Sequence, residues 1–340
     1  MIVETGGADA RLGPIIGLPL LLEELGVAPA LAFRQAGVSL ELFADADNRV
    51  SGEAVFGLLG VCANLSGRSD FGLLLGSRFT LADFGPLGEL IRNAATVGEA
   101  LRMLLLHLRL YDRLAAPILL RAESKSVFLG YSLQHPTSEG AMQLQDIAIV
   151  LAYRILRELC GPGWQPQLVR FSHRRPASLI AYRRVFGPAV QFDAVLSGLS
   201  FDTAWLEHRI AGAEPERYRA LQAALREADA DWPAGFAQEV QCVLHQLLAG
   251  GSVCAASVAQ LFGCSERTLR EKLRAEGAGM QHLLAATRFE LACHLLQNTE
   301  LPLARIAVAL CYADPAVFSR AFRGWAGVSP RQWRNTNRKQ

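Results

Sequence analysis

The chain has 340 residues, of which 51% are hydrophobic and 19% charged, and its net charge at pH 7 is +2. This composition excludes an intrinsically disordered protein, and the length predicts two domains rather than one compact core. No stretch approaches the roughly 18 unbroken apolar residues of a membrane span, and no signal-peptide pattern opens the chain, so we expect a cytoplasmic protein without membrane contact.

Basic charge is concentrated at the carboxyl end. Residues 251–340 contain 12 lysines and arginines against 6 acidic residues, a net charge of +6, whereas the remainder of the chain carries −4. This asymmetry is compatible with a polyanion-binding module joined to a module with another task, and equally with a solvated basic surface.

The seven cysteines are scattered and form no Cys-x-x-Cys pair. An odd set with this spacing argues against a disulfide framework and against a structural zinc site. We therefore expect buried, reduced thiols, no metal site and no cofactor.

In chain order, the first predicted elements are helices between residues 20 and 110. Leu101, Leu104 and Leu108 recur at helical spacing, and Thr96 with Glu99 resembles a capping box before them. The apolar runs 116–121 and 126–133, separated by polar residues, then predict a β-hairpin.

A helix over 138–160 follows, closed by the breaker Gly161-Pro162-Gly163. Further along, the pattern predicts a short helix over 177–186 and a helix that carries Trp205 and Leu206. Short strands are predicted at 167–171, 190–192 and 199–201. The first domain, residues 1–210, is therefore expected to be an α+β domain.

Residues 211–235 are rich in Ala, Glu, Asp and Arg and contain Pro215 and Pro233. This composition predicts a linker with a partly exposed helix. Residues 236–340 then form the second domain, which we expect to be all-α.

The second domain contains a first helix-turn-helix pattern. Apolar Val258, Ala259, Phe262, Leu269 and Leu273 lie on the inner faces of two short helices interrupted by Gly263-Cys264-Ser265. Ser265 is a suitable N-cap for the second helix. Arg267, Arg270 and Arg274 then fall on its outer face, where they can reach guanine edges or phosphates.

The same arrangement recurs about 48 residues later. Ile306, Ala307 and Leu310 precede a turn, and Phe318 and Phe322 provide the apolar side of the next helix. Asp314 is its expected N-cap, with Pro315 at the first helical position. The outward face then carries Ala316, Ser319, Arg320 and Arg323.

These motifs resemble the AraC/XylS family of bacterial regulators. The resemblance rests on Gly263-Cys264-Ser265-Glu266-Arg267-Thr268-Leu269, on Phe318-Ser319-Arg320-Ala321-Phe322 and on the closing Gly327-Val328-Ser329-Pro330, within a match from about 253 to 333. It implies two helix-turn-helix units joined by a long helix, here residues 279–298. On that helix Leu284, Leu291 and Leu295 are expected to pack against both units. Each unit would place one recognition helix in the major groove of promoter DNA.

The outer faces and the resemblance together define the candidate DNA contacts, which are Arg267, Thr268, Arg270, Glu271, Arg274, Ala316, Ser319, Arg320 and Arg323. Glu271 suits this role only if it accepts from cytosine N4 or orients a neighbouring arginine. Two positions depart from the family pattern. Cys311 stands where the second turn usually has glycine, and Cys254 stands where the first unit commonly has a serine cap, and both changes are expected to reduce stability.

The first domain resembles the regulatory domain of the ornithine-utilisation-regulator type. The residues that carry this resemblance are Phe84-Gly85-Pro86-Leu87-Gly88, Ala95-Thr96-Val97-Gly98-Glu99-Ala100-Leu101 and Phe171-Ser172-His173-Arg174-Arg175-Pro176. It implies binding of a small-molecule effector and dimerisation, with RNA polymerase as a further partner.

The sequence does not define the effector pocket. Arg174 and Arg175 are candidates for an anionic effector, although a solvated loop is favoured. Phe84, Tyr111, Phe128 and Tyr131 are expected in the core rather than in a pocket.

No serine or cysteine lies in a nucleophile-elbow or histidine-supported motif, so we expect no catalytic residues and no enzyme. The leading interpretation is a DNA-binding transcriptional regulator that responds to an effector, and the sequence leaves open whether it is an activator or a repressor. The alternatives are a constitutive dimeric regulator without an effector and an enzyme fused to a DNA-binding module.

Overall fold

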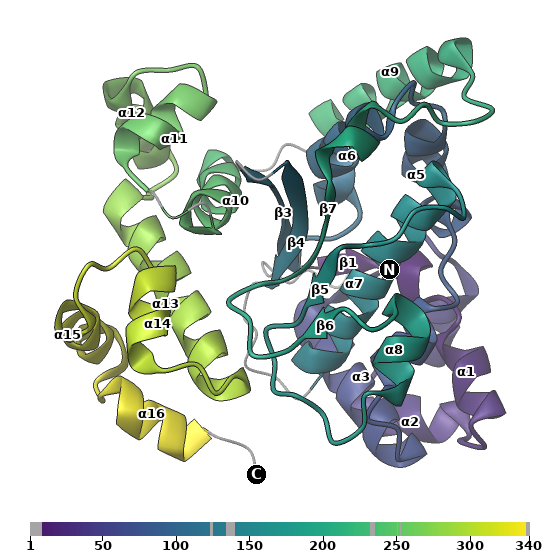
Figure 1. Cartoon of the computed structure of the whole chain (residues 1–340), viewed down its shortest axis with the longest axis horizontal. Helices are drawn as coiled ribbons and strands as arrows, with labels where there is room; N and C mark the ends of the chain where they lie inside the picture. The colour runs from purple at the N-terminus through teal and green to yellow at the C-terminus, as the bar shows by residue number, and fades with distance from the viewer. Residues whose placement is uncertain are drawn as a thin grey trace.

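The computed structural model describes residues 9–122, 125–133, 140–231, 235–249, 251 and 253–337. Two lobes are visible in Figure 1, an α+β lobe up to residue 231 and a helical lobe from residue 236. The predicted fold class, an α+β domain followed by an all-α domain, is confirmed.

The α+β lobe begins with a helical layer. Its helices are α1 (Leu18–Glu24), α2 (Pro29–Ala36), α3 (Gly52–Ser66), α4 (Phe71–Gly76), α5 (Gly85–Arg92) and α6 (Val97–His107), with the 3-10 helices η1 (Gly13–Ile15), η2 (Leu40–Ala44), η3 (Leu81–Phe84) and η4 (Leu108–Leu110). Strands β1 (Asp9–Arg11) and β2 (Arg49–Ser51) pair antiparallel beside them. The predicted cap of α6 is confirmed, since the Thr96 hydroxyl accepts from the Glu99 N–H at 3.3 Å.

A five-stranded sheet follows within the described residues, in the order β3-β4-β7-β5-β6. The strands are β3 (Ala115–Ala122), β4 (Ser126–Leu133), β5 (Leu168–Arg170), β6 (Val190–Gln191) and β7 (Ser197–Asp202). β3 and β4 form the predicted hairpin, with Ala115 opposite Leu133 and Ala122 opposite Ser126. Only the β5–β6 pair is parallel.

Helix α7 (Ala141–Cys160) lies between the sheet and the helical layer, packed on β4 and β7 on one side and on α3 and α4 on the other. Because both faces are covered, most of its residues are buried. It ends at Gly161, whose φ of +81° fits the predicted breaker. The first two residues of the predicted helix, 138 and 139, lie outside the described residues.

Two predicted helices are shorter than expected. α8 (Ile180–Phe186) begins three residues after the predicted start. The predicted helix at Trp205 and Leu206 is a 3-10 helix, η5 (Thr203–Glu207), because the backbone becomes extended at His208.

Helix α9 (Pro215–Asp231) occupies most of the predicted linker. It lies along α5, and Leu225 is buried in the core of the α+β lobe, while Tyr218 and Leu221 pack against that core. The segment is therefore attached to the α+β lobe over much of its length.

The helical lobe consists of α10 (Phe236–Ala249), α11 (Ala255–Leu261), α12 (Glu266–Ala275), α13 (Met280–Asn298), α14 (Leu303–Ala309), α15 (Pro315–Ala326) and α16 (Pro330–Asn337). It has two cores that share α13. Leu284 belongs to the core of the first unit with Leu269 and Leu273, and Leu291 and Leu295 belong to the core of the second. The long joining helix and its packing on both units are thus as predicted. Within the described residues, no helix is both long and apolar enough to cross a membrane.

Candidate DNA-binding surface and interior cavity

The first recognition helix is α12, which is fixed by its cap and its buried face. The Ser265 hydroxyl accepts from the Thr268 N–H at 3.1 Å, and the two hydroxyl oxygens lie 2.9 Å apart. Leu269 and Leu273 are fully buried. Thr268 therefore contributes to the cap, and the opposite face of the helix is left to charged side chains.

The charged face of α12 carries Arg267, Arg270, Glu271 and Arg274, all exposed. Arg267 Nε lies 2.9 Å from Glu271 Oε1, and Arg270 pairs with Glu266 at 3.1 Å. The two arginine side chains are 87% and 68% exposed, and such pairs one helical turn apart stabilise a helix by only about 0.3–0.5 kcal/mol. The arginines can therefore exchange these carboxylates for phosphate or guanine at little cost.

The second recognition helix is α15. Asp314 caps it by accepting from the Ala316 N–H at 2.7 Å, with Pro315 in the first turn, as predicted. Phe318 and Phe322 are fully buried.

The outward face of α15 carries exposed Ala316, Arg320 and Arg323, and half-buried Ser319 donates to the Pro315 carbonyl at 2.9 Å. Neither arginine forms an ion pair within the described part of the chain. Both guanidinium groups are thus available to an anionic partner.

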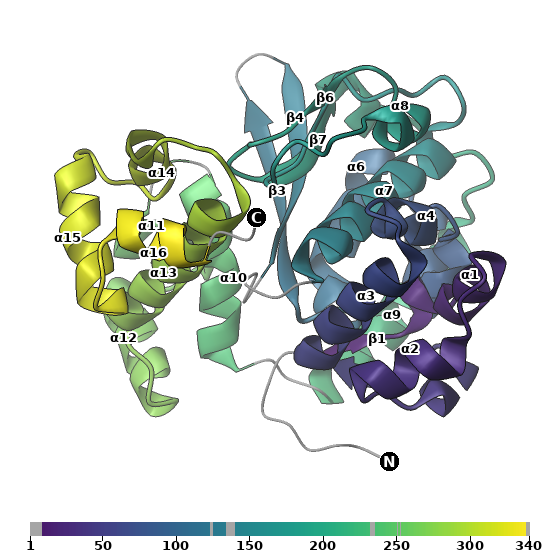
Figure 2. The same cartoon turned by 90° about the horizontal axis from the view of Figure 1, so that it is seen from below.

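Figures 1 and 2 show α12 and α15 on the side of the helical lobe that faces away from the α+β lobe. The two recognition helices therefore lie on a side of the helical lobe that the α+β lobe does not cover (Figures 1 and 2).

The second turn contains the predicted departure at Cys311. Its φ is +59°, the value that Gly263 has in the first turn. The Cys311 thiol lies 3.9 Å from the Leu248 carbonyl and packs at the core of the first unit. A side chain in this left-handed region costs roughly 1–2 kcal/mol, which glycine avoids.

Cys311→Gly should therefore raise the free energy of unfolding of the DNA-binding lobe by about 0.5–1 kcal/mol, since glycine's greater freedom in the unfolded chain offsets part of the relief. Urea unfolding followed by circular dichroism measures this change. Cys311→Ala keeps the Cβ atom and should give no gain. Equal stabilisation by both variants would attribute the effect to the thiol rather than to the backbone.

The expectation of buried thiols is wrong for Cys254. All seven cysteines are free, and Cys254 is exposed because it is the N-cap of α11, where its sulfur accepts from the Ser257 N–H at 3.3 Å. No group of three or more potential ligands for a metal is found in the described residues.

The two lobes meet first where β3 lies along α10. Ser132 Oγ, at the end of β4, lies 3.1 Å from Nδ1 of His245. Both side chains are buried, and burial lowers the pKa of His245 to about 4. The histidine is therefore neutral at pH 7 in this contact.

The second contact joins α13 to the α+β lobe. His294 Nε2 lies 2.9 Å from Ser172 Oγ and 3.2 Å from Gln145 Nε2, and all three side chains are buried. Burial, with a smaller effect from the charge of His173, lowers the pKa of His294 to about 4. At the edge of this contact, Arg174 pairs with Glu300 at 2.9 Å.

The candidate Arg174 is thus engaged between the lobes, where it also donates to the Gln297 carbonyl at 3.2 Å. Arg175 is exposed. The sequence could not indicate this interface, because its partners come from elements more than a hundred residues apart.

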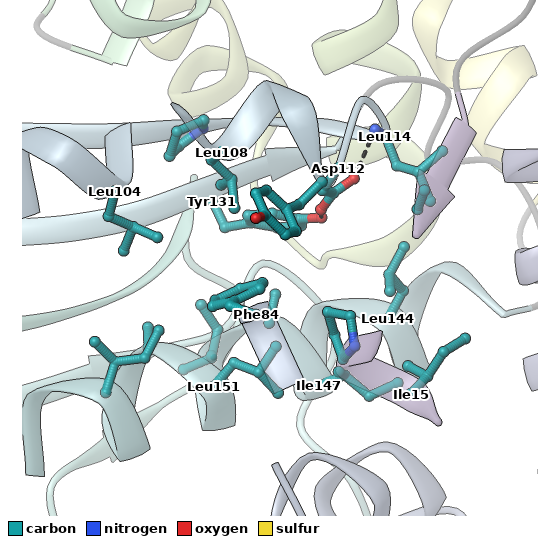
Figure 3. A pocket seen from close by; sticks show the side chains of 18 of the residues that line it. Ile15, Phe84, Leu104, Leu108, Asp112, Leu114, Tyr131, Leu144, Ile147 and Leu151 are labelled. Atoms are coloured by element: carbon teal, nitrogen blue, oxygen red, sulfur yellow. Dashed lines mark hydrogen bonds between the residues drawn. The ribbon is translucent and has the colours of Figure 1, made fainter. Parts of the chain in front are cut away.

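A cavity of about 100 Å³ lies inside the α+β lobe, between the hairpin and α7 (Figure 3). Asp112 and Tyr131 are on one wall, and Phe84, Ile147 and Leu151 are on the opposite wall. Tyr131 donates to Asp112 Oδ2, and the Leu114 N–H donates to Oδ1 at 2.7 Å. Burial is the main cause that raises the pKa of the Asp112 carboxyl.

Of the four aromatic residues expected in the core, Phe84, Tyr111 and Tyr131 line this cavity. Phe84 and Tyr111 are also buried, so each belongs to the core and lines the cavity. Phe128 does not line it, and the Arg170 guanidinium lies over its ring at 5.7 Å. Tyr131 packs against the core and also lines the cavity. The expectation of a core position is wrong for Phe128, which is half-buried and lies outside the core cluster.

Two helix-turn-helix units that share one helix, with arginines on both outward helices, define a DNA-binding transcriptional regulator. Residues 26–210 match the family described as the arabinose-binding domain of AraC transcription regulator, and residues 258–336 match a helix-turn-helix domain. The first match covers more than half of the chain. The chain therefore belongs to the AraC family of transcription regulators.

Similar proteins include the HTH-type transcriptional regulator VirS of Mycobacterium tuberculosis, 28% identical over 96% of this chain and 97% of VirS. The ornithine utilization regulator of Pseudomonas aeruginosa is 29% identical over the same shares of the two chains. The crystal structure of CdpR from Pseudomonas aeruginosa is 27% identical, covers 78% of this chain and 86% of its own, and has a TM-score of 0.41. VirS and the ornithine utilization regulator are both named as regulators.

Proposed function

We propose that the chain regulates transcription in response to a small molecule bound in the cavity of its α+β lobe. Occupancy of the cavity alters how α12 and α15 engage promoter DNA. The family model is named for arabinose binding, and the apolar lining of this cavity argues against a sugar. RNA polymerase and a second copy of the chain, which the family resemblance implies, are further partners in this proposal.

One observation carries the proposal: the elements that line the cavity also contact the DNA-binding lobe. On β4, Tyr131 lines the cavity and the next residue, Ser132, contacts His245. On α7, Leu144 lines the cavity and the next residue, Gln145, contacts His294. A ligand that shifts either element changes both contacts, and such coupling is typically about 1–3 kcal/mol, or roughly 5–150-fold in affinity.

A thermal-shift screen of small metabolites on the full chain should yield a compound that raises Tm and also changes promoter affinity. Ala148→Leu should abolish both effects, because Ala148 lines the cavity and a larger side chain fills it. Tm and fluorescence anisotropy with labelled promoter DNA are the two measurements.

The matched control is Ala220→Leu, at an exposed position of α9, which should leave both effects intact. A broad screen without any stabilising compound, together with full regulation by a constitutive dimer, would favour a regulator that needs no effector.

We further propose that the outward residues of α12 and α15 contact DNA. If Arg320 reads a base edge, Arg320→Ala should weaken promoter binding by about 1–3 kcal/mol and relax selectivity at one operator position. Binding to a set of single-base operator variants measures both effects.

Arg219→Ala is the control, since Arg219 is an exposed arginine on α9 in the other lobe. If Arg320→Ala weakens binding to all sequences equally and only lowers the salt dependence, Arg320 contacts phosphate instead.

A further inference from the structure

The cavity has an almost wholly hydrocarbon lining. Its walls come from residues 10–15, from residues 108–114 after α6, from the β3–β4 hairpin and from one side of α7. Besides Phe84, the apolar residues that line it include Ile15, Leu104, Leu108, Leu129, Leu144, Ile147, Leu151 and Ile155. A lining of this kind favours apolar ligands over water.

The main polar feature is the pair formed by Asp112 and Tyr131. The Asp112 carboxylate has about four lone-pair sites, and two of them are used by the Tyr131 hydroxyl and the Leu114 N–H. The Tyr131 oxygen also retains acceptor capacity, because its proton is donated to Asp112. One wall of the cavity therefore offers hydrogen-bond acceptors to a ligand that carries a donor (Figure 3).

Charge disfavours an anionic ligand. A ligand carboxylate bound beside the Asp112–Tyr131 pair would lie next to the Asp112 carboxyl, and the two acidic groups would repel each other. Arg11, the cation in the lining, is paired with Asp47, and its guanidinium lies 4.6 Å from the Tyr111 ring centroid.

A pentose fits no better than an anion, because most of its hydroxyl groups would face hydrocarbon without partners. A free α-amino acid brings two charges into the same surroundings.

Size sets the remaining limit. An engineered cavity of roughly 150 Å³ lined by Leu, Ile and Phe binds benzene, and this cavity is about 100 Å³. Benzene has six non-hydrogen atoms, so one ring or a short chain of about six or seven non-hydrogen atoms is the upper limit for a ligand here.

We propose that the cavity binds a small uncharged alcohol of largely hydrocarbon character, phenolic or aliphatic, whose hydroxyl donates to the Asp112–Tyr131 pair. This inference rests on the proposed function in one respect only, namely that the α+β lobe is the sensor. It adds the position and the chemical class of the effector.

Isothermal titration calorimetry on the full chain tests it with phenol, 1-hexanol, toluene, hexanoate, D-xylose and L-lysine. Phenol and 1-hexanol should bind saturably. Toluene, which lacks the donor, should bind about tenfold more weakly than phenol. Hexanoate, D-xylose and L-lysine should give no binding heat.

Two kinds of variant link the binding to the cavity. Asp112→Asn should reduce the preference for phenol over toluene to about threefold or less, because it replaces the carboxylate acceptor by an amide whose NH2 group cannot accept. Tyr131→Phe removes the donor that occupies one Asp112 oxygen, so it should keep or increase the preference for phenol. Ala148→Leu should abolish binding of both compounds, and Ala220→Leu should change neither. If the Asp112 variant does not fold, Tyr131→Phe and Ala148→Leu still test the site.

The outcomes separate this inference from the proposed function. Binding of phenol with no change in promoter affinity would support the site and contradict its sensory role. A sugar, amino acid or carboxylate that binds and changes promoter affinity would keep the sensory role and overturn the ligand class. Absence of binding by both alcohols, or equal binding to Ala148→Leu, overturns the inference.

Discussion

Lowering the pH from 7 to 5 should release the DNA-binding lobe from the α+β lobe. The two buried histidines between the lobes, His245 and His294, have pKa values lowered to about 4. In the released state each returns toward about 6.5. The stabilisation by the neutral rings is therefore complete above about pH 6.5 and decreases as the pH falls toward 4. At pH 5 the loss is about 2 kcal/mol for each histidine.

Small-angle X-ray scattering should then show a larger radius of gyration at pH 5, while circular dichroism reports the helix content of the two lobes. His245→Gln and His294→Gln are the matched variants, since glutamine keeps hydrogen-bonding capacity toward Ser132, Ser172 and Gln145 without titrating in this range. The double variant should remain compact at pH 5. An unchanged acid transition in the double variant would mean that other groups hold the lobes together.

The DNA-binding lobe could be predicted closely from the sequence because its signals are local. Ser265 and Asp314 lie directly before their helices, and each accepts a backbone N–H within three residues. The periodic leucines of α13 also identified their partners correctly, since the apolar stripe of a helix must be covered by the elements next to it. The Arg267–Glu271 pair supports the interpretation in which Glu271 orients an arginine.

For the α+β lobe, the fold class could be predicted from the sequence but the cavity could not. The hairpin followed from two apolar runs separated by polar residues, and the end of α7 followed from the Gly161-Pro162-Gly163 breaker. The cavity arises from the way that α7, the hairpin and residues 10–15 pack together. Asp112 and Tyr131 are 19 residues apart and meet only through the fold. The signal available in the sequence was an acidic residue, Asp112, within a mostly apolar stretch.

The lobe interface was missed for the same reason. His294 lies 149 residues from Gln145 and 122 from Ser172. His294 lies beside the leucines of α13, and the sequence alone does not indicate that the α+β lobe contacts it.

The geometry of α13 leads to the second large effect, which concerns operator spacing. The helix has 19 residues and at 1.5 Å per residue spans roughly 28 Å. This is close to the roughly 34–36 Å between major-groove segments one turn apart. Because Leu284 packs on the first unit and Leu295 on the second, the two recognition helices cannot slide independently. Each monomer should therefore read two subsites about 10 base pairs apart.

Inserting five base pairs between the subsites should weaken specific binding by roughly 10- to 1,000-fold. The insertion adds half a turn and moves the second subsite to the opposite face of the DNA. The base contacts of one unit, at about 1–3 kcal/mol each, are then lost. Footprinting first defines the subsites for the full chain on a single operator, and anisotropy then measures affinity. An operator of unchanged length with five substituted spacer pairs controls for sequence.

An insertion of ten base pairs returns the second subsite to the same face of the DNA as the first. It also places that subsite about 34 Å farther along the duplex, which is beyond what α13 can span. It should therefore weaken binding as much as the five-pair insertion does. Recovery at ten pairs would indicate a flexible connection, in conflict with the shared packing of α13. Full affinity with the five-pair insertion would mean that only one unit reads bases. The strained turn at Cys311 would then make the second unit the first to examine, and Cys311→Gly should restore its contribution.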